Sequence, residues 1–162
     1  MRIITDTGRS FDLEKFLSIP LVAHLSTMTE ESPRDSPVWF YWKDKRIWII
    51  GTASDTFPDR IRKNPKCAIG IVDFNQHTGL FLHAGFRGRA TVKPFEKEMA
   101  NQLLSRYLGT EIEEWDPRFK DLDESNVLIC FKPETVVVRD QSYVLPERNK
   151  KDGSAKKANR LL

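Results

Sequence analysis

The residues of this sequence best suited to chemistry are those that would bind an anion. The polar run Thr52–Thr56 carries three hydroxyl groups and leads into a short segment with helical spacing. Free backbone N–H groups and the helix dipole favour negative charge at such a place, and Arg60 adds a cation one turn on. Asp55 would repel a phosphate unless its carboxylate points away. The alternative interpretation is a capped short helix with a solvated basic face.

A second basic set lies on a long stretch of alternating apolar and polar residues, Leu80 to Val92. Side chains alternate between the two faces of a strand, which places His83, Arg87 and Arg89 together on one face. Two interpretations stay open. The three are either solvent-facing residues of a barrel strand or a further contact for the same anionic ligand.

Other chemistries find little support in the sequence. It contains no Gly-x-Ser-x-Gly elbow, no cysteine placed for thiol catalysis and no Walker or dinucleotide phosphate loop. The three histidines show neither His-x-His nor His-x-x-x-His spacing, so no metal site is expected. We identify no catalytic acid or base.

The elements that must position the candidate residues begin with a β-hairpin. Ser36 to Trp42 and Ile47 to Thr52 are predicted as its arms, joined by a tight turn at Lys43 to Arg46. Both arms are apolar on both faces, whereas a strand on a barrel surface normally has one wet face. The core would cover one face, and a partner subunit, a helix or a planar ligand would cover the other.

The remaining pattern indicates a mainly β (α+β) fold, an antiparallel barrel of six to seven strands with one long and two short helices. The long helix is expected from about Phe95 to Leu108, with Gly109 as its stop. Gly85 and Gly88 would let the long strand bend. The last strand is interrupted at Lys132-Pro133-Glu134, and a proline there requires an edge or a bulge.

Length and composition favour a single domain, residues 1–146, followed by a tail, 147–162. The tail holds six Lys/Arg and two Asp/Glu and so carries +4, whereas the domain carries −1 and is near neutral; together they give the net charge of +3. A specific nucleic-acid surface is therefore not expected on the domain. The tail is predicted to be disordered and solvated, with a nonspecific polyanion contact as the alternative.

We expect a cytoplasmic protein, because the sequence shows no membrane span and no signal-peptide layout. Cys67 and Cys130 lie in apolar strand-like runs. Free buried cysteines suit that compartment, and a disulfide is the alternative.

An anion site beside an apolar aromatic wall suits a ligand that is flat at one end and phosphorylated at the other. Flavin mononucleotide (FMN) has this form, and cofactor pockets are commonly apolar with a few placed polar groups.

At this point the chain resembles the pyridoxamine-5′-phosphate-oxidase-like family of flavin-binding split β-barrels. The segments that carry the resemblance are Leu21 to Thr27, Ser36-Pro37-Val38-Trp39-Phe40, Ile47 to Thr52, Arg60-Ile61-Arg62-Lys63-Asn64-Pro65, Phe86-Arg87-Gly88-Arg89-Ala90 and Val127 to Arg139. The resemblance implies a split barrel and a homodimer with two flavin sites at its interface. The outward aromatic face of the hairpin would then be covered by partner and cofactor together.

The resemblance also implies roles for particular positions. The cofactor-binding residues predicted in this way, together with the anion set, are Val38, Trp39, Phe40, Thr52, Ala53, Ser54, Thr56, Arg60, His83 and Arg87. Many family members carry a phosphate-binding Lys, or an Arg-Lys pair, where this chain has Thr56-Phe57. Phe57 supplies no charge, and Arg60 is the candidate substitute.

The expected function is that of an FMN-dependent oxidoreductase acting on an unknown small molecule. The alternatives are a noncatalytic split barrel that binds a flavin or haem, a deazaflavin (F420)-dependent reductase, and a barrel that has lost its cofactor. The C-terminal signature of true pyridoxamine phosphate oxidases is not evident, so that activity is not predicted.

Overall fold

The alternating stretches of the sequence form one curved sheet of eight strands, antiparallel except where β1 joins it. The computed structural model describes residues 1–5 and 11–146, so the predicted tail, 147–162, lies outside the described residues. The strands are β1 (Arg2–Thr5), β2 (Ala23–Met28), β3 (Pro33–Val38), β4 (Tyr41–Lys43), β5 (Arg46–Gly51), β6 (Lys66–Asn75), β7 (Leu80–Pro94) and β8 (Val127–Asp140). Their order in the sheet is β3-β2-β6-β7-β8-β5-β4, and β1 pairs in parallel with β8. The sheet does not close, which confirms the predicted split barrel.

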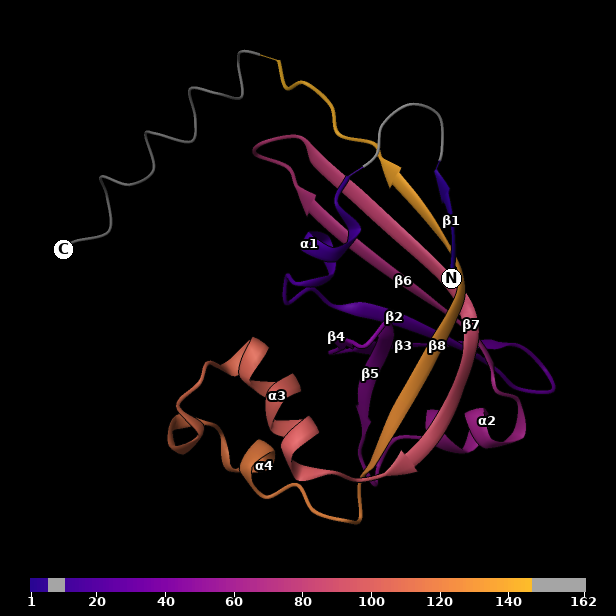
Figure 1. Ribbon diagram of the computed structural model, residues 1–162, viewed down its shortest axis with the longest axis vertical. Helices are drawn as coiled ribbons and strands as arrows, with labels where there is room; N and C mark the ends of the chain where they lie inside the picture. Colours follow the sequence, from indigo (N-terminus) through magenta and orange to yellow (C-terminus); the bar gives the residue numbers. More distant parts are fainter. Residues whose placement is uncertain (6–10, 147–162) are drawn as a thin grey trace.

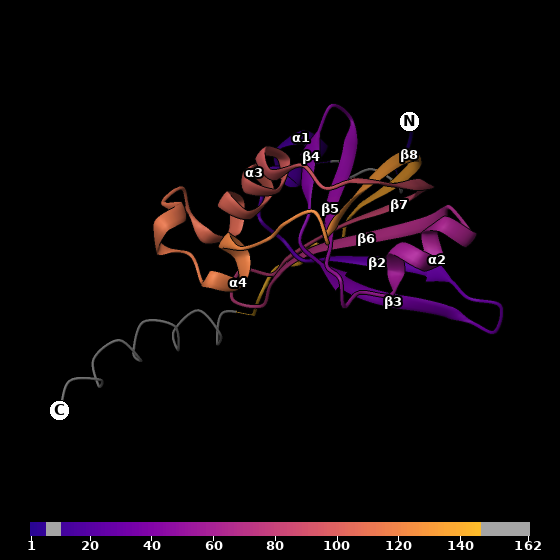
Figure 2. The ribbon, with the colours of Figure 1, turned by 90° about the horizontal axis from the view of Figure 1, so that it is seen from below.

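The helices lie at two ends of this sheet. They are α1 (Leu13–Leu17), α2 (Phe57–Lys63), α3 (Lys97–Leu108), the 3-10 turn η1 (Ile112–Glu114) and α4 (Pro117–Lys120). In Figures 1 and 2, α3 and α4 lie together on one side of the molecule and α2 lies on the other. The predicted long helix is confirmed, and Gly109 ends it with a φ of 89°. Because α4 has only four residues, it lacks the periodicity that predicts a helix.

The two longest strands, β7 and β8, pair along nearly their whole length. The prediction of two final strands is corrected, because β8 continues through Pro133. The pairing shifts by one position between Arg87 and Gly88, and Gly88 then lies opposite Pro133. This irregularity accommodates the missing proline N–H.

The predicted strand Ser36–Trp42 is wrong as a single element. The chain ends β3 at Val38, passes Trp39 and Phe40 outside any strand, and starts β4 at Tyr41. β3 pairs with β2 at one edge of the sheet, whereas β4 pairs with β5 at the other edge. The turn from β4 to β5 is the predicted tight one, with positive φ at its two central residues, Asp44 and Lys45.

Two strands lie partly or wholly where none was expected. The sheet exceeds the six to seven strands predicted because β1 is added and the segment Ser36–Trp42 is divided between β3 and β4. β1 is four residues long, too short for a clear alternation. The polar composition of the segment Pro33–Asp35 predicts a loop, but this segment forms the first half of β3, where it pairs with β2.

A first hydrophobic cluster fills the concave side of the sheet. It joins inward residues of the long strands, such as Ile69, Phe86 and Phe131, to Phe16 of α1 and Ile61 of α2. Each of these side chains is at most 2% exposed. Val38 and Phe40 belong to this cluster, so one apolar face of the hairpin region is covered by the core, as expected.

A second cluster covers the other apolar face. Leu103 and Leu104 of α3, together with Trp115, form its centre. Trp39, Tyr41 and Ile50 pack against them. The sequence left three candidates for covering this face: a partner subunit, a helix and a planar ligand. At these residues a helix of the same chain, α3, covers it. That a partner and a cofactor together also cover this face stays a prediction.

Candidate functional site

A large hollow opens where the end of β3, the end of β5, α3 and α4 meet. Its volume is about 1020 Å³. The described residues that line it are Val22, Asp35, Ser36, Pro37, Val38, Trp39, Ile50, Thr52, Ala53, Ser54, Asp55, Phe57, Leu103, Leu104, Arg118, Phe119, Leu122 and Asn126. Most of these are apolar. The polar ones lie at the Thr52–Asp55 turn, at the β3 edge, and on the far side at Arg118 and Asn126. A hollow with this lining suits a flat, largely apolar ligand with a polar end.

The apolar wall of the hollow is built on Trp39. The indole of Trp39 stacks on the ring of Tyr107, with centroids 4.6 Å apart and planes 2° apart. The ring of Phe119, in α4, also stacks on the indole of Trp39, with centroids 5.4 Å apart and planes 25° apart. Three aromatic rings from separate segments therefore hold one another in place.

The hydroxyl of Tyr107 fixes this wall to the sheet. It accepts a hydrogen bond from the N–H of Phe40 at 3.0 Å and donates to the carbonyl oxygen of Leu21 at 2.8 Å. Burial raises the pKa of Tyr107 above its ordinary value, so the phenol keeps its proton and remains a donor. These bonds supply partners for the N–H of Phe40, at the break between β3 and β4, and for the carbonyl of Leu21, just before β2.

The polar end of the hollow is a turn that is already internally bonded. The N–H of Thr52 donates to a carboxylate oxygen of Asp55 at 2.7 Å, and the hydroxyl of Thr52 contacts the same oxygen at 2.8 Å. The hydroxyls of Thr52 and Ser54 are 3.0 Å apart. The carboxylate of Asp55 thus points into the turn. The predicted anion site required this carboxylate to point away.

Arg60 lies beside this end rather than in it. Its guanidinium donates to three hydroxyls, those of Thr27 at 2.7 Å, Thr56 at 2.6 Å and Ser36 at 3.4 Å. Of these partners only Ser36 lines the hollow. Arg60 therefore ties α2 to β2 and β3, and its predicted contact with a cofactor phosphate stays a prediction.

Replacing Arg60 with alanine is expected to destabilise the protein by about 1–2 kcal/mol. The hydroxyl of Thr27 is fully buried and would lose its charged partner. The matched control is Arg62→Ala, because Arg62 is an exposed arginine of the same helix and pairs with exposed Asp59. That change should stay within about 0.5 kcal/mol. Urea denaturation of both variants measures the difference, and equal losses would show that the hydroxyl contacts contribute nothing.

The hollow brings together five of the ten predicted cofactor residues. These are Val38, Trp39, Thr52, Ala53 and Ser54. Thr56 and Arg60 flank it, as described above, whereas Phe40 is fully buried in the first cluster. His83 and Arg87 alternate with the buried residues Ala84 and Phe86 on β7 and so lie on the outer face of the sheet. Within one chain these two do not reach the hollow.

His83 is neutral at pH 7 in this position. Burial lowers the pKa of its imidazole below the ordinary value, and the nearby charge of Arg139 lowers it further. His83 therefore adds a hydrogen-bonding group to the outer face, not a positive charge.

The sequence interpretation missed the far wall of the hollow. Leu103 and Leu104 were recognised as part of an apolar helical stripe, but not as ligand-facing. Arg118, Phe119, Leu122 and Asn126 fall in a polar and aromatic stretch without clear periodicity. The one local signal there is Asp116-Pro117, a cap followed by a proline at the first helical position.

The structure offers no thiol or metal chemistry among its described residues. Cys67 and Cys130 are free. Burial raises the pKa of Cys67 to about 11 and raises that of Cys130 as well, so both remain protonated thiols at neutral pH. No group of three His, Cys, Asp or Glu side chains in residues 1–5 and 11–146 could hold a metal ion. No helix in the same ranges has the length and apolar character to cross a membrane.

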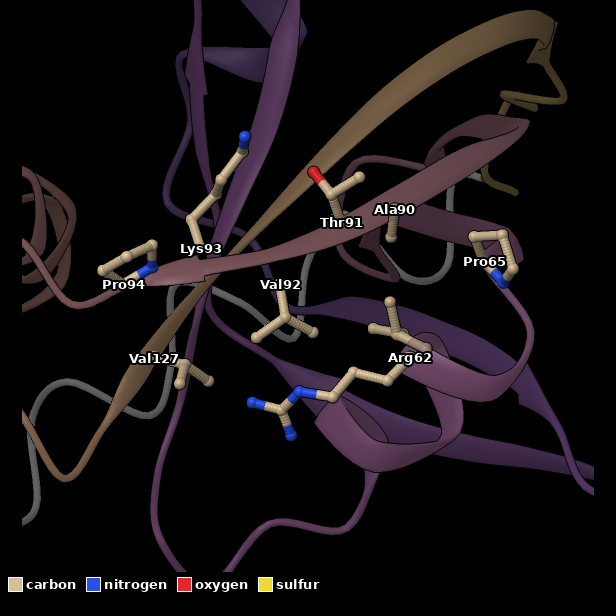
Figure 3. Close-up of a pocket in the computed structure, with 9 residues that line it drawn as sticks. Arg62, Pro65, Ala90, Thr91, Val92, Lys93, Pro94 and Val127 are labelled. Carbon is tan, nitrogen blue, oxygen red and sulfur yellow. The ribbon is translucent and has the colours of Figure 1, made fainter.

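A smaller hollow of about 520 Å³ lies between α2 and the end of β7. Val92 and Val127 form an apolar floor, and Arg62 extends across it (Figure 3). Lys93 and Thr91 point away from this floor, to the opposite side of β7. Arg62, the cation that extends over the floor, already pairs with Asp59 at 2.6 Å. This groove therefore has fewer ligand-binding features than the larger hollow.

A family model described as pyridoxamine 5′-phosphate oxidase matches residues 12–140. This match spans every strand of the sheet except β1 and includes all of the described residues that line the hollow. The chain belongs to the pyridoxamine 5′-phosphate oxidase family. Membership confirms the resemblance inferred from the motif order. No curated protein matches the sequence.

Solved structures with the fold of the pyridoxamine 5′-phosphate oxidase family differ in what they bind. An F420 reductase is 23% identical, with a TM-score of 0.60 over 79% of this chain and 98% of that one. A FAD-binding protein from Mesorhizobium loti is 18% identical, with a TM-score of 0.63 over 83% and 98%. The flavocytochrome Anf3 from Azotobacter vinelandii is 13% identical, with a TM-score of 0.64 over 86% and 72%. At these identities the likeness establishes the fold alone.

Proposed function

We propose that the chain binds a flavin in the large hollow and acts as a flavin-dependent oxidoreductase on a small molecule. The observation that carries the proposal is the aromatic wall. Trp39 is held rigidly by Tyr107 and Phe119, and it lines a space of about 1020 Å³. This volume is at the upper end of the range of cofactor pockets. Similarity to an F420 reductase and to a FAD-binding protein supports a ring system of this kind.

The bound flavin would supply the hydride and electron chemistry. The chain's own residues would orient its ring and keep water from it. Trp39, Ile50 and Leu103 provide an apolar surface for one part of the ring. The Thr52–Asp55 turn and Asn126 provide polar atoms at the margin. No acid or base is assigned.

The protein would act as a homodimer. Within one chain, His83 and Arg87 lie on the outer face of the sheet, so they could contact a flavin only in the hollow of a second copy. Exposed apolar side chains on and beside that face support such a contact: Phe74 is 54% exposed, Val72 is 43% exposed and Val22, at the mouth of the hollow, is 47% exposed. Sedimentation velocity of the protein should give twice the mass of the chain.

A deazaflavin of the F420 type is the second candidate. The F420 reductase is more similar in sequence than the two other structures described above, and the isoalloxazine and deazaflavin rings have the same flat shape. Haem is less well supported. The residues that line the hollow include no His, Cys, Met or Tyr to serve as an axial ligand.

The experiment that tests the proposal is a titration of the purified protein with free flavins and with F420, followed by fluorescence and visible absorption. A flavin should bind with a shifted spectrum and quenched fluorescence, because it would stack close to Trp39. Reduction of the bound flavin by a nicotinamide cofactor, and its reoxidation by an acceptor, separates an enzyme from a storage protein. A protein that binds neither riboflavin nor FMN would refute the flavin assignment, and binding of F420 alone would establish the second candidate.

A further inference from the structure

We infer that the hollow selects a flavin whose sugar chain ends without a phosphate, because the Asp55 carboxylate occupies the anion position of the Thr52–Thr56 turn. The inference rests on the proposed function and names the form of ligand that the same site takes. It departs from the expectation of FMN, which assumed that this turn was open to an anion.

The donors of Thr52, which were expected to help hold a phosphate, are already used. The N–H and the hydroxyl of Thr52 both lie within hydrogen-bond distance of one carboxylate oxygen of Asp55, at 2.7 and 2.8 Å. Asp55 also donates its own N–H to the carbonyl oxygen of Thr52 at 3.0 Å, which closes the turn. The hydroxyl of Ser54 is 3.0 Å from that of Thr52 and belongs to the same network. A phosphate would have to displace a charged acceptor from these donors.

The cations that could compensate are also engaged. Arg60 directs three of its donors to hydroxyl groups of its own chain and does not line the hollow. Arg118 does line it, but its guanidinium forms two bonds to the carboxylate of Asp116, at 3.0 and 3.1 Å. Phe57, which follows the turn directly, carries no charge, is 3% exposed and packs in the first cluster.

The charges that face the hollow are therefore unfavourable for a phosphate. Among the described residues of its lining are two carboxylates, Asp55 and Asp35, the latter 2.9 Å from Nδ1 of His24, against one guanidinium, that of Arg118. A phosphate dianion placed at the turn would meet Asp55 at close range. Repulsion between neighbouring charges near a protein surface changes a dissociation constant by about tenfold or more. A neutral chain end, such as the terminal hydroxyl of riboflavin, could instead donate a hydrogen bond to Asp55.

The test compares riboflavin and FMN as ligands of the full chain and of the variant Asp55→Asn. The unchanged protein should bind riboflavin about tenfold more tightly than FMN. Asparagine keeps an oxygen that can accept from the N–H of Thr52 but removes the charge. Asp55→Asn should therefore strengthen FMN binding about tenfold and leave riboflavin within about twofold. The control is Asp59→Asn, which removes a charge from exposed α2 outside the hollow and should change neither constant.

A salt series on the unchanged protein gives an independent reading that needs no variant. If FMN is repelled, rising ionic strength should bring its dissociation constant down towards that of riboflavin. Weaker FMN binding at high salt would show net attraction and overturn the inference. So would FMN binding as tight as that of riboflavin, or an FMN-to-riboflavin ratio unaltered by a folded Asp55→Asn protein. These results would leave flavin binding intact, whereas binding of neither flavin would overturn the proposed function and this inference together.

Discussion

Gly88→Ala should destabilise the protein by roughly 3 kcal/mol or prevent it from folding. A Cβ atom at this position would lie 2.2 Å from the carbonyl oxygen of Lys132 and 2.9 Å from the Cα of Pro133. Both are backbone atoms of β8, so no side chain can rotate away to make room. The contact lies at the point where the pairing of β7 and β8 shifts register. The expected loss is therefore that of a sheet forced apart at its two longest strands, measured by thermal and urea denaturation.

The matched control is Gly70→Ala on the neighbouring strand β6. A Cβ at Gly70 would meet no atom within 4 Å. Because alanine loses less backbone entropy than glycine on folding, this change should be neutral or slightly stabilising, within about 0.5 kcal/mol. If Gly88→Ala is as mild as Gly70→Ala, then β7 and β8 do not approach as closely as the structure indicates.

Trp39→Ala should have the largest effect on ligand binding. The indole of Trp39 stacks on two rings and lines the hollow, so its loss removes the wall and the packing that positions it. We expect the flavin dissociation constant to rise by at least about tenfold and stability to fall by about 2–3 kcal/mol. Affinity is measured by fluorescence titration at a temperature where the variant is folded by circular dichroism.

A second tryptophan separates binding from stability. Trp48 is half-buried on β5 and pairs with Tyr41 across the hairpin, but it does not line the hollow. Trp48→Ala should cost a similar free energy of unfolding and leave flavin affinity within about twofold. Equal losses of affinity in the two variants would mean that ligand binding follows overall stability, and that Trp39 has no direct contact.

Much of the fold follows from local pattern. Alternation from Leu80 onwards predicts β7, the stripe ending at Leu108 predicts α3, and Gly109 ends that helix. The hairpin turn at Asp44 and Lys45 is likewise local, because two residues join strands that are adjacent in sequence. These features depend on side-chain periodicity and backbone conformation within a few residues, which the sequence displays directly.

The candidate site was predictable only in part. Val38, Trp39 and the Thr52–Ser54 run, all predicted from the sequence, line one hollow, and their contact with a cofactor stays a prediction. The opposite wall could not be predicted, because Arg118 and Phe119 reach it from a stretch with no periodic signal. The division between Val38 and Tyr41 was missed as well. It depends on which strands lie beside β3 and β4, and a local pattern does not contain that information.

By itself, the sequence determined that the hairpin region has two apolar faces and that hydroxyl groups gather just beyond it. Only the tertiary structure decided what meets them. The helix that covers the second face is fixed through Tyr107, 67 positions along the chain from its partner Phe40. The hydroxyl of Thr52 bonds to Asp55 within the same turn. The hydroxyl of Thr56 accepts from Arg60, which also donates to Thr27, 33 positions away. Residue types show which groups need partners, but the choice among partners is made by the three-dimensional packing of distant segments.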